Sequence, residues 1–202
     1  MKILGTGLSG LVGSRVVELL KDQYDFDSSE VDITDRNAII EKIKSSEAPI
    51  ILHMAAKTSV DGCEKDREKD ISTVSHPEAV KGSHEMLNQV QHDRQKRFWT
   101  SQNDDEWKDE KTAWAINVFG TQNVVDACEK NNKKLIYIST DFVFDGSQNV
   151  YNENDKPNPI NWYGATKYEG EKIVQSSSTP WIIARLAYPY RSHFEKKDFI
   201  RI

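Results

Sequence analysis

Cysteine is scarce in this sequence, and the two residues present, Cys63 and Cys128, form no CxxC pair and have no zinc-like spacing. A disulfide framework is therefore excluded, and the composition suits a reducing compartment. Long hydrophobic runs are also missing, since no stretch approaches the roughly 18 apolar residues that span a membrane. The chain enters a predicted strand at once, without the charged and apolar leader of a secreted protein. Together these absences predict a cytoplasmic protein.

The chain has no excess of basic residues either. It carries 27 Lys and Arg against 32 Asp and Glu, a formal net charge of −5. A mildly acidic surface argues against nucleic acid or an anionic membrane as the main partner. With 37% hydrophobic residues over 202 positions, the composition is that of a globular protein with one core and at most a small appendage.

Short apolar strands alternate with amphipathic helices along most of the chain. Strands are predicted at 2–4, 24–27, 49–54, 134–139 and 181–186, and helices at 10–20, 36–45, 112–130 and 161–175. Thr34 or Asp35 is the expected N-cap of the second helix. Such alternation predicts an α/β fold, a doubly wound parallel sheet of the Rossmann type with right-handed crossovers.

A glycine-rich turn, TGLSGLVG at 6–13, follows the first strand and opens the first helix. In this context Gly7 allows a tight turn, Gly10 lets the backbone approach a pyrophosphate, and Gly13 lets the helix pack closely on the sheet. The free N–H groups at the start of the helix then face the phosphates. The motif predicts dinucleotide binding.

An acidic residue about 20 positions further on holds the ribose in many NAD-binding proteins. Asp32 lies near that distance, but so do Asp27 and Glu30. Asp32 could instead lie beside the adenine or cap the next helix. Because no Arg follows the second strand closely, the choice between NAD and NADP stays open.

Tyr163 and Lys167 lie four residues apart and so share one face of a predicted helix. A tyrosine with a pKa near 10 is a weak proton donor and acceptor at neutral pH. A neighbouring ammonium favours its anion, and this pairing predicts acid–base chemistry.

A third motif, STDFVFDG at 139–146, follows a buried strand. Open α/β sheets bind ligands at the carboxyl ends of their strands. The hydroxyl of Thr140 is therefore expected to polarise a substrate carbonyl group.

In this order the motifs resemble those of the extended short-chain dehydrogenases and reductases, and more closely the dTDP-4-dehydrorhamnose reductase family. The resemblance also rests on VDITD at 31–35, HMAAKTSVDGCE at 53–64, Asn117, Tyr151 with Glu153, YGATKYEGE at 163–171 and Arg185. It covers residues 1–66 and 112–190.

The resemblance implies a role for each matching residue. Catalysis is assigned to Thr140, Tyr163 and Lys167. Cofactor binding is assigned to Gly7, Gly10, Leu11, Val12, Gly13, Asp32, Ile33, Ala55, Ala56, Lys57, Tyr163 and Lys167. Substrate binding is assigned to Val60, Asp61, Asp141 and Arg185, and Asn117 supports the geometry of the site. No metal is expected.

The implied activity is NAD(P)H-dependent reduction of a nucleotide-linked 4-keto-6-deoxy sugar. Sugar-nucleotide 4,6-dehydratases have an Asp-Glu pair after the catalytic Thr, whereas here Phe142 follows Asp141. Three alternatives are kept open: a sugar-nucleotide epimerase, a non-catalytic subunit like the regulatory subunit of methionine adenosyltransferase, and an inactive relic. A nucleotide sugar is the expected small-molecule partner, and a homodimer is the candidate assembly.

Two segments depart from the family pattern. Residues 67–111 are polar, have no strand signal, and are interpreted as an insertion into a 1–190 dinucleotide-binding domain. Its three histidines, His76, His84 and His92, do not form an HExxH motif, so a solvated segment is predicted and not a metal site. Residues 191–202 are expected to begin a substrate lobe that is mostly absent.

Overall fold

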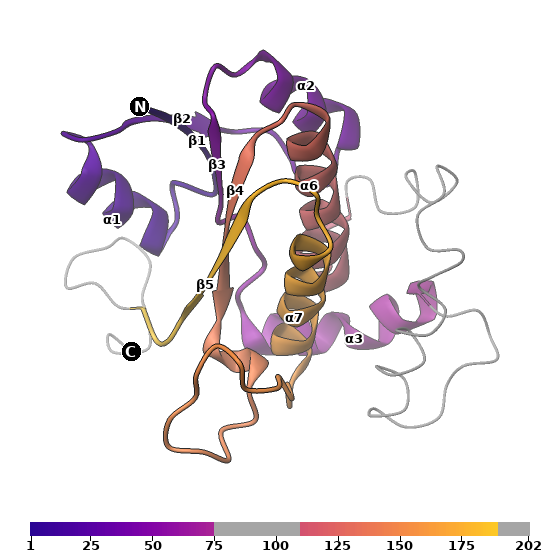
Figure 1. Cartoon of the computed structure of the whole chain (residues 1–202). Coiled ribbons are helices and arrows are strands. Elements are labelled where there is room, and N and C mark those ends of the chain that lie inside the picture. The colour runs from indigo at the N-terminus through magenta and orange to yellow at the C-terminus, as the bar shows by residue number, and fades with distance from the viewer. Residues whose placement is uncertain (75–109, 190–202) are drawn as a thin grey trace.

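The computed structural model describes residues 1–74 and 110–189, which form a three-layer α/β arrangement (Figure 1). Five parallel strands make one sheet in the order β2-β1-β3-β4-β5. The strands are β1 (Lys2–Thr6), β2 (Asp25–Ser29), β3 (Ile50–His53), β4 (Lys134–Thr140) and β5 (Trp181–Leu186). The α/β prediction is confirmed, and each strand lies where the apolar pattern placed it.

Helices cover the sheet unequally. They are α1 (Leu11–Leu20), α2 (Arg36–Ser45), α3 (Val60–Val74), η2 (Ala115–Gly120), α6 (Thr121–Lys130), η3 (Asp141–Val143) and α7 (Trp162–Gln175). Figure 1 shows α2, α6 and α7 against one face and α1 against the other. Of the two residues proposed as the N-cap of α2, Thr34 and Asp35, the structure selects Asp35. Its carboxylate accepts the N–H of Ala38.

The core lies between the central strands and the α6–α7 layer. Ile51 of β3 and Leu135 of β4 are paired in register, and both side chains are fully buried. Strands covered on both faces are expected to be nearly continuous runs of branched apolar residues, as the sequences of β3 and β4 are.

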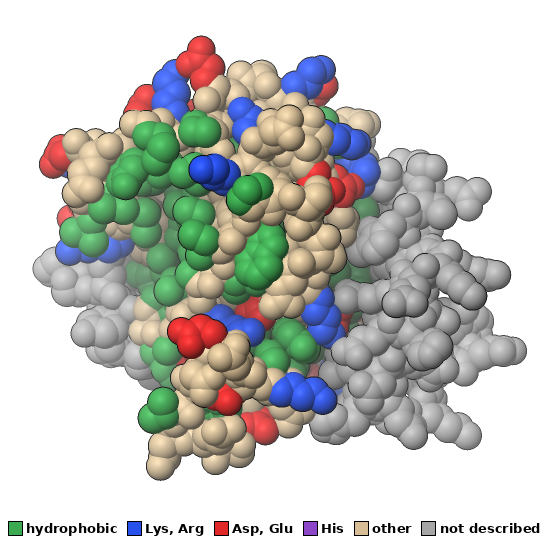
Figure 2. Space-filling model, in the orientation of Figure 1, with side chains coloured by type: hydrophobic (Ala, Val, Ile, Leu, Met, Phe, Trp, Pro, Cys, Tyr) green, Lys and Arg blue, Asp and Glu red, His purple; other side chains and the backbone are tan. Residues whose placement is uncertain are grey.

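The α1 face of the sheet is less completely covered. Hydrophobic side chains gather there over β4 and β5 (Figure 2). Ile182 on β5 and Leu19 on α1 are each more than half exposed. In the described ranges α1 is the helix that this face carries, so the β5 edge of the face is only partly covered.

The predicted helix at 112–130 is interrupted by a wider, π-helical turn, η2. At its end the hydroxyl of Thr121, the first residue of α6, donates to the Asn117 carbonyl at 2.7 Å. At Gly120 an added Cβ would lie 2.7 Å from the Cδ1 of Ile33, so this turn packs directly against the loop after β2. Turns of this kind recur at functional sites, and this one carries Asn117.

The start of the segment interpreted as an insertion is helical, since α3 continues from Val60 to Val74. Its sequence is mostly charged, so periodicity gives little sign of the helix. Contacts with the returning chain hold it: Asp66 accepts the N–H of Ala113 at 2.8 Å, and Asp70 accepts that of Trp114 at 3.0 Å. Residues 67–74, the first part of the segment interpreted as an insertion, thus belong to α3, while His76, His84 and His92 lie outside the described residues.

Asp70 is a buried carboxylate at the junction of α3 and α7. It also accepts the indole N–H of Trp162 at 2.8 Å, and the rings of Trp162 and Trp114 are stacked 5.9 Å apart. Both indoles are buried, as expected for packing residues. Burial raises the pKa of Asp70 although hydrogen bonds from Thr112, Trp162 and Trp114 oppose the rise.

No helix in residues 1–74 and 110–189 is long and apolar enough to cross a membrane. Cys63 and Cys128 are buried free thiols, in agreement with the expected absence of a disulfide between them.

Ile51→Ala should lower the free energy of unfolding by about 2–5 kcal/mol, because it opens a cavity in the centre of the sheet. Urea unfolding followed by circular dichroism measures the change. Leu19→Ala on the exposed side of α1 is the matched control and should cost about 0.5 kcal/mol or less. Similar losses for the two variants would contradict the placement of the core.

Asp70→Asn should remove a pH-dependent component of stability. Because the pKa of Asp70 in the folded chain lies above its ordinary value of 3.8, the folded state binds this proton more tightly than the unfolded state. The stabilisation that the Asp70 proton contributes is therefore complete below pH 3.8 and is lost as the pH rises through the raised pKa.

Thermal melting of wild type and variant across the acidic range measures this effect. The wild type should lose stability relative to Asp70→Asn as the pH rises, whereas exposed Asp61→Asn should follow the wild type. Parallel curves for wild type and Asp70→Asn would refute the assignment.

Candidate active site

A cavity of about 800 Å³ opens at the carboxyl ends of the strands, where loops after β1, β2, β3 and β4 meet the start of α7. This edge is the one at which open parallel sheets bind ligands. Predicted residues that line it are Gly7, Gly10, Leu11, Val12, Gly13, Asp32, Ile33, Ala55, Ala56, Val60, Thr140, Asp141, Tyr163 and Lys167. Most of the residues proposed from sequence are thus brought together in one cavity.

The glycine-rich turn forms one wall, and its backbone leaves no room for side chains. Gly7 has a φ of 72°, in the left-handed region that favours glycine. A Cβ at Gly13 would lie 2.6 Å from the Cα of Leu8 and 2.7 Å from the carbonyl oxygen of Gly7. The helix that follows has no side-chain N-cap. Its first N–H groups are thus available to an anion, as the motif predicts.

Asp32 lies at the end of the cavity formed by the loop after β2. Its carboxylate accepts the N–H of Thr34 at 3.0 Å and the hydroxyl of Thr34 at 2.8 Å, and it pairs with the Lys111 ammonium. Burial alone would raise the pKa of Asp32, but these bonds outweigh it and hold the pKa below its ordinary value. Asp32 is therefore ionised at neutral pH, and Lys111 is a pocket residue that the sequence patterns do not reveal.

Tyr163 and Thr140 approach each other from α7 and β4. The Thr140 hydroxyl lies 3.1 Å from the Asp141 carboxylate to which it donates, and it accepts the N–H of Phe142 at 3.3 Å. From the sequence, Lys167 is expected to lower the pKa of Tyr163. In the structure burial raises that pKa instead, and the neighbouring Thr140 hydroxyl opposes the rise.

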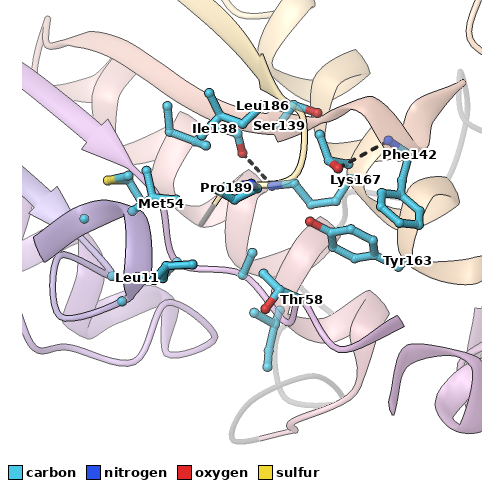
Figure 3. Close-up of a pocket in the computed structure, with 18 of the residues that line it drawn as sticks. Leu11, Met54, Thr58, Ile138, Ser139, Phe142, Tyr163, Lys167, Leu186 and Pro189 are labelled. Carbon is cyan, nitrogen blue, oxygen red and sulfur yellow. Dashed lines mark hydrogen bonds between the residues drawn. The ribbon is translucent and has the colours of Figure 1, made fainter. Parts of the chain in front are cut away.

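Lys167 points into the same cavity from one helical turn further along α7 (Figure 3). Its ammonium donates to the Ile138 carbonyl at 2.8 Å and lies 4.0 Å from the ring centre of Tyr137. Burial lowers the pKa of Lys167 to about 7, and the negative charge of Glu171 opposes the decrease. This lysine can therefore gain or lose a proton near neutral pH.

Asn117 joins the loop after β3 to the helix that carries Tyr163. Its amide oxygen accepts the N–H of Lys57 at 2.8 Å, and its amide nitrogen donates to the Lys57 carbonyl and to the Thr166 hydroxyl, both at 3.0 Å. Thr166 in turn donates to the Tyr163 carbonyl at 3.0 Å. These bonds agree with the supporting role that the resemblance implies for Asn117.

Three residues assigned to the site from sequence lie outside the cavity wall. Lys57 forms an ion pair with Asp66 at 2.6 Å, and Asp61 is exposed on α3. Arg185 donates to both carboxylate oxygens of Glu171, at 2.9 and 2.7 Å. The Arg185–Glu171 pair fastens β5 to α7 and occupies the guanidinium that was expected to bind substrate.

The sequence assigns no role to the other wall residues. They are Ser9, Val31, Met54, Thr58, Lys111, Ile116, Ile138, Ser139, Phe142, Leu186, Tyr188 and Pro189. Several lie inside the sequence motifs, such as Met54 before Ala55 and Phe142 after Asp141. Their place inside a motif at a strand end is the signal that would have found them.

Comparison with known proteins gives a consistent family. The model described as the RmlD substrate binding domain matches residues 1–80 and 97–202. The dTDP-4-dehydrorhamnose reductase of Aggregatibacter actinomycetemcomitans is 28% identical over 94% of this chain and 52% of its own length. The methionine adenosyltransferase 2 subunit beta of Bos taurus is 41% identical over 75 residues, which is 37% of this chain and 22% of its own length.

A solved structure agrees with these sequence matches. The dTDP-4-dehydrorhamnose reductase of Bacillus anthracis, in complex with NADP, is 28% identical and has a TM-score of 0.72, over 98% of this chain and 57% of its own. Curated relatives that match most of this chain are much longer, and the chain spans about half of their length. The residues that the family model leaves unmatched, 81–96, form a shorter segment than the insertion expected at 67–111.

Gly13→Ala should weaken NADPH binding by about tenfold or more, because the added Cβ meets backbone atoms and forces the phosphate-facing turn open. Calorimetric titration measures the affinity. Arg15→Ala, in the same helix at an exposed ion pair with Glu18, is the control and should bind as the wild type does. Equal affinities for all three proteins would show that the turn does not form the binding site.

Proposed function

Because this chain belongs to the RmlD substrate binding domain family, we propose that it is an NADPH-dependent reductase of a nucleotide-linked 4-keto-6-deoxy sugar. The observation that carries the proposal is the meeting of Thr140, Tyr163 and Lys167 in one cavity whose opposite wall is the glycine-rich turn. Thr140 and Tyr163 both line this cavity, and their two hydroxyl groups are suited to hydrogen-bond a single carbonyl oxygen.

The cavity fits a dinucleotide along its length. Gly7 and Gly13 let the turn pack closely against the backbone of Ala55 and Leu8, and the open start of α1 suits a pyrophosphate. Asp32 and Ile33 would hold the adenosine end, and Ala55 and Ala56 the middle. Lys167 would bind the ribose at the catalytic end. NADP in the Bacillus anthracis relative favours NADPH as the dinucleotide of this chain.

When bound, the dinucleotide supplies a hydride to the carbonyl carbon of the sugar. The chain's own residues deal with the oxygen. Thr140 would donate its hydroxyl proton in a hydrogen bond to that oxygen, and the Tyr163 phenol would transfer its proton to it. The carbonyl group thereby becomes an alcohol, with one hydride and one proton added.

The site orients these groups before substrate arrives. Asn117 holds the loop after β3 against α7 through Thr166, so Tyr163 is fixed relative to the cofactor wall. The Lys167 ammonium favours the phenolate that forms when Tyr163 gives up its proton. The raised pKa of Tyr163 keeps the phenol protonated before the reaction.

The substrate class rests on the wall beside Thr140. Asp141 is followed by Phe142, whose ring lies 5.7 Å from that of Tyr163. A second carboxylate for removing water from the sugar is therefore missing from this position, which favours simple reduction over dehydration. Val60 and Asp141 would contact the sugar; Asp61 and Arg185 are less favourably placed, outside the wall.

A location in the cytoplasm is proposed from the cysteine usage. Cys63 and Cys128 are free thiols, which suit a reducing compartment. A homodimer stays a prediction.

One alternative is favoured by a specific observation, the match to methionine adenosyltransferase 2 subunit beta. Under it the chain would bind a dinucleotide and a partner protein without turning over a sugar. The chemistry of the cavity favours catalysis, because a binding subunit needs neither the Thr140 nor the Tyr163 hydroxyl at this position.

Purified full chain should bind NADPH one-to-one in calorimetry and oxidise it when dTDP-4-dehydrorhamnose is added. Tyr163→Phe removes the proton donor, so it should lower kcat by about a hundredfold or more while leaving the NADPH affinity unchanged. Loss of NADPH absorbance measures the rate. Tyr168→Phe, on the same helix but outside the cavity wall, is the matched control and should retain the wild-type rate.

Folded chain that binds no NADPH would refute the cofactor assignment. Binding without oxidation would overturn the reductase in favour of the non-catalytic alternative. Turnover that survives Tyr163→Phe would remove Tyr163 from the mechanism.

A further inference from the structure

Tyr137 lies directly beneath the catalytic lysine, although no sequence motif includes it. It belongs to β4, is fully buried, and its ring centre is 4.0 Å from the Lys167 ammonium nitrogen. An ammonium over the face of an aromatic ring is attracted by the ring's negative face, and the attraction is strongest where water is excluded. Lys167 is itself 2% exposed, so the contact is made out of water.

The ammonium has few other partners. It donates one hydrogen bond, to the Ile138 carbonyl at 2.8 Å. No carboxylate in the described part of the chain forms an ion pair with it, and Glu171 acts only as a more distant negative charge. The aromatic face of Tyr137 and the Ile138 carbonyl are therefore the two contacts that compensate for burying this charge.

The fold reserves a place for the Tyr137 ring. A Cβ at Gly170 would lie 2.3 Å from the Tyr137 hydroxyl oxygen and 2.9 Å from the Asn117 carbonyl oxygen. The hydroxyl reaches the Lys167 carbonyl at 3.5 Å. Any side chain at Gly170 would thus push the ring away from Lys167.

His53 supports the same ring from β3. The two ring centres are 5.5 Å apart, and the imidazole is held by Thr6 at 2.7 Å and Thr121 at 3.1 Å. Burial, with a smaller effect of Lys167, lowers the pKa of His53 to about 3. The imidazole is therefore neutral at physiological pH and adds no positive charge beside the ammonium.

We propose that Tyr137 is the positioning residue of Lys167: its ring holds the ammonium at the Ile138 carbonyl, on the wall of the cavity. The effect of this contact on turnover depends on the proposed reductase function. The contact itself does not, and it is measurable in the chain without any dinucleotide.

Nuclear magnetic resonance of chain labelled with ¹³C at the lysine side chains tests the contact directly. Protons above an aromatic face resonate upfield, so the ε-CH₂ signal of Lys167 should lie upfield of those of exposed lysines. Lys167→Arg identifies the signal by removing it. A Lys167 signal at the position of exposed lysines in the wild type would overturn the proposal without any further variant.

Two substitutions separate the ring from the hydroxyl. Tyr137→Phe keeps the aromatic face, so the upfield signal should remain. Tyr137→Leu removes the face, and the signal should move to the position of exposed lysines. A Phe variant that behaves like the Leu variant would show that the hydroxyl, and not the ring, places Lys167.

A pH titration of the same signal measures how tightly Lys167 binds its proton. Loss of packing alone would not weaken this binding. The groups that face Lys167 are Glu171 and Tyr163 on α7, His53 on β3 and Tyr137 on β4. Removing the ring should weaken proton binding by Lys167 about tenfold, while Tyr137→Phe leaves it unchanged.

Calorimetry with NADPH distinguishes this proposal from the proposed function. If NADPH is not bound but the upfield signal is present, the reductase assignment fails and the positioning contact stands. If NADPH is bound and oxidised but the signal is absent, the positioning contact fails alone.

Discussion

The amide group of Asn117 is the constraint on which the arrangement of the cavity depends. Its three hydrogen bonds join the loop after β3, which forms the cofactor wall, to α7, which carries Tyr163 and Lys167. The amide is fully buried, so an unpaired donor or acceptor there would cost the full free energy of desolvation. Both walls of the cavity are held at a fixed distance because neither can move without breaking these bonds.

A second set of polar contacts connects the loop after β3 to Asn117 through the sheet. The Thr6 hydroxyl accepts the N–H of Ala55 at 3.2 Å and contacts His53, whose other ring nitrogen contacts Thr121. Thr121 donates to the carbonyl of Asn117 itself. The glycine-rich turn and the catalytic helix are thus connected through buried, satisfied polar groups, which specify one geometry more sharply than apolar packing does.

The described parts of the chain on either side of residues 75–109 are fastened to each other. Asp66 and Asp70 accept the N–H groups at the start of the returning helix, and Lys69 pairs with Glu110 at 2.7 Å. The two ends of the excursion are therefore fastened to each other at the edge of α3. Length added between such points is tolerated because loop-closure entropy grows slowly with length.

The sequence by itself determined the order of the strands and of α1, α2, α6 and α7, the parallel sheet, the glycine-rich turn, and the Tyr163 and Lys167 pair on one helix face. Each depends on local patterns: apolar periodicity, glycine spacing, and residues four apart on one helix. The role of Thr140 beside this pair came from the family resemblance. Only the tertiary structure decided that Arg185 pairs with Glu171, that α3 continues to Val74, and that Tyr137 lies beneath Lys167. Those facts depend on residues distant in sequence that become neighbours when strands and helices pack, and no local pattern records which of them will meet.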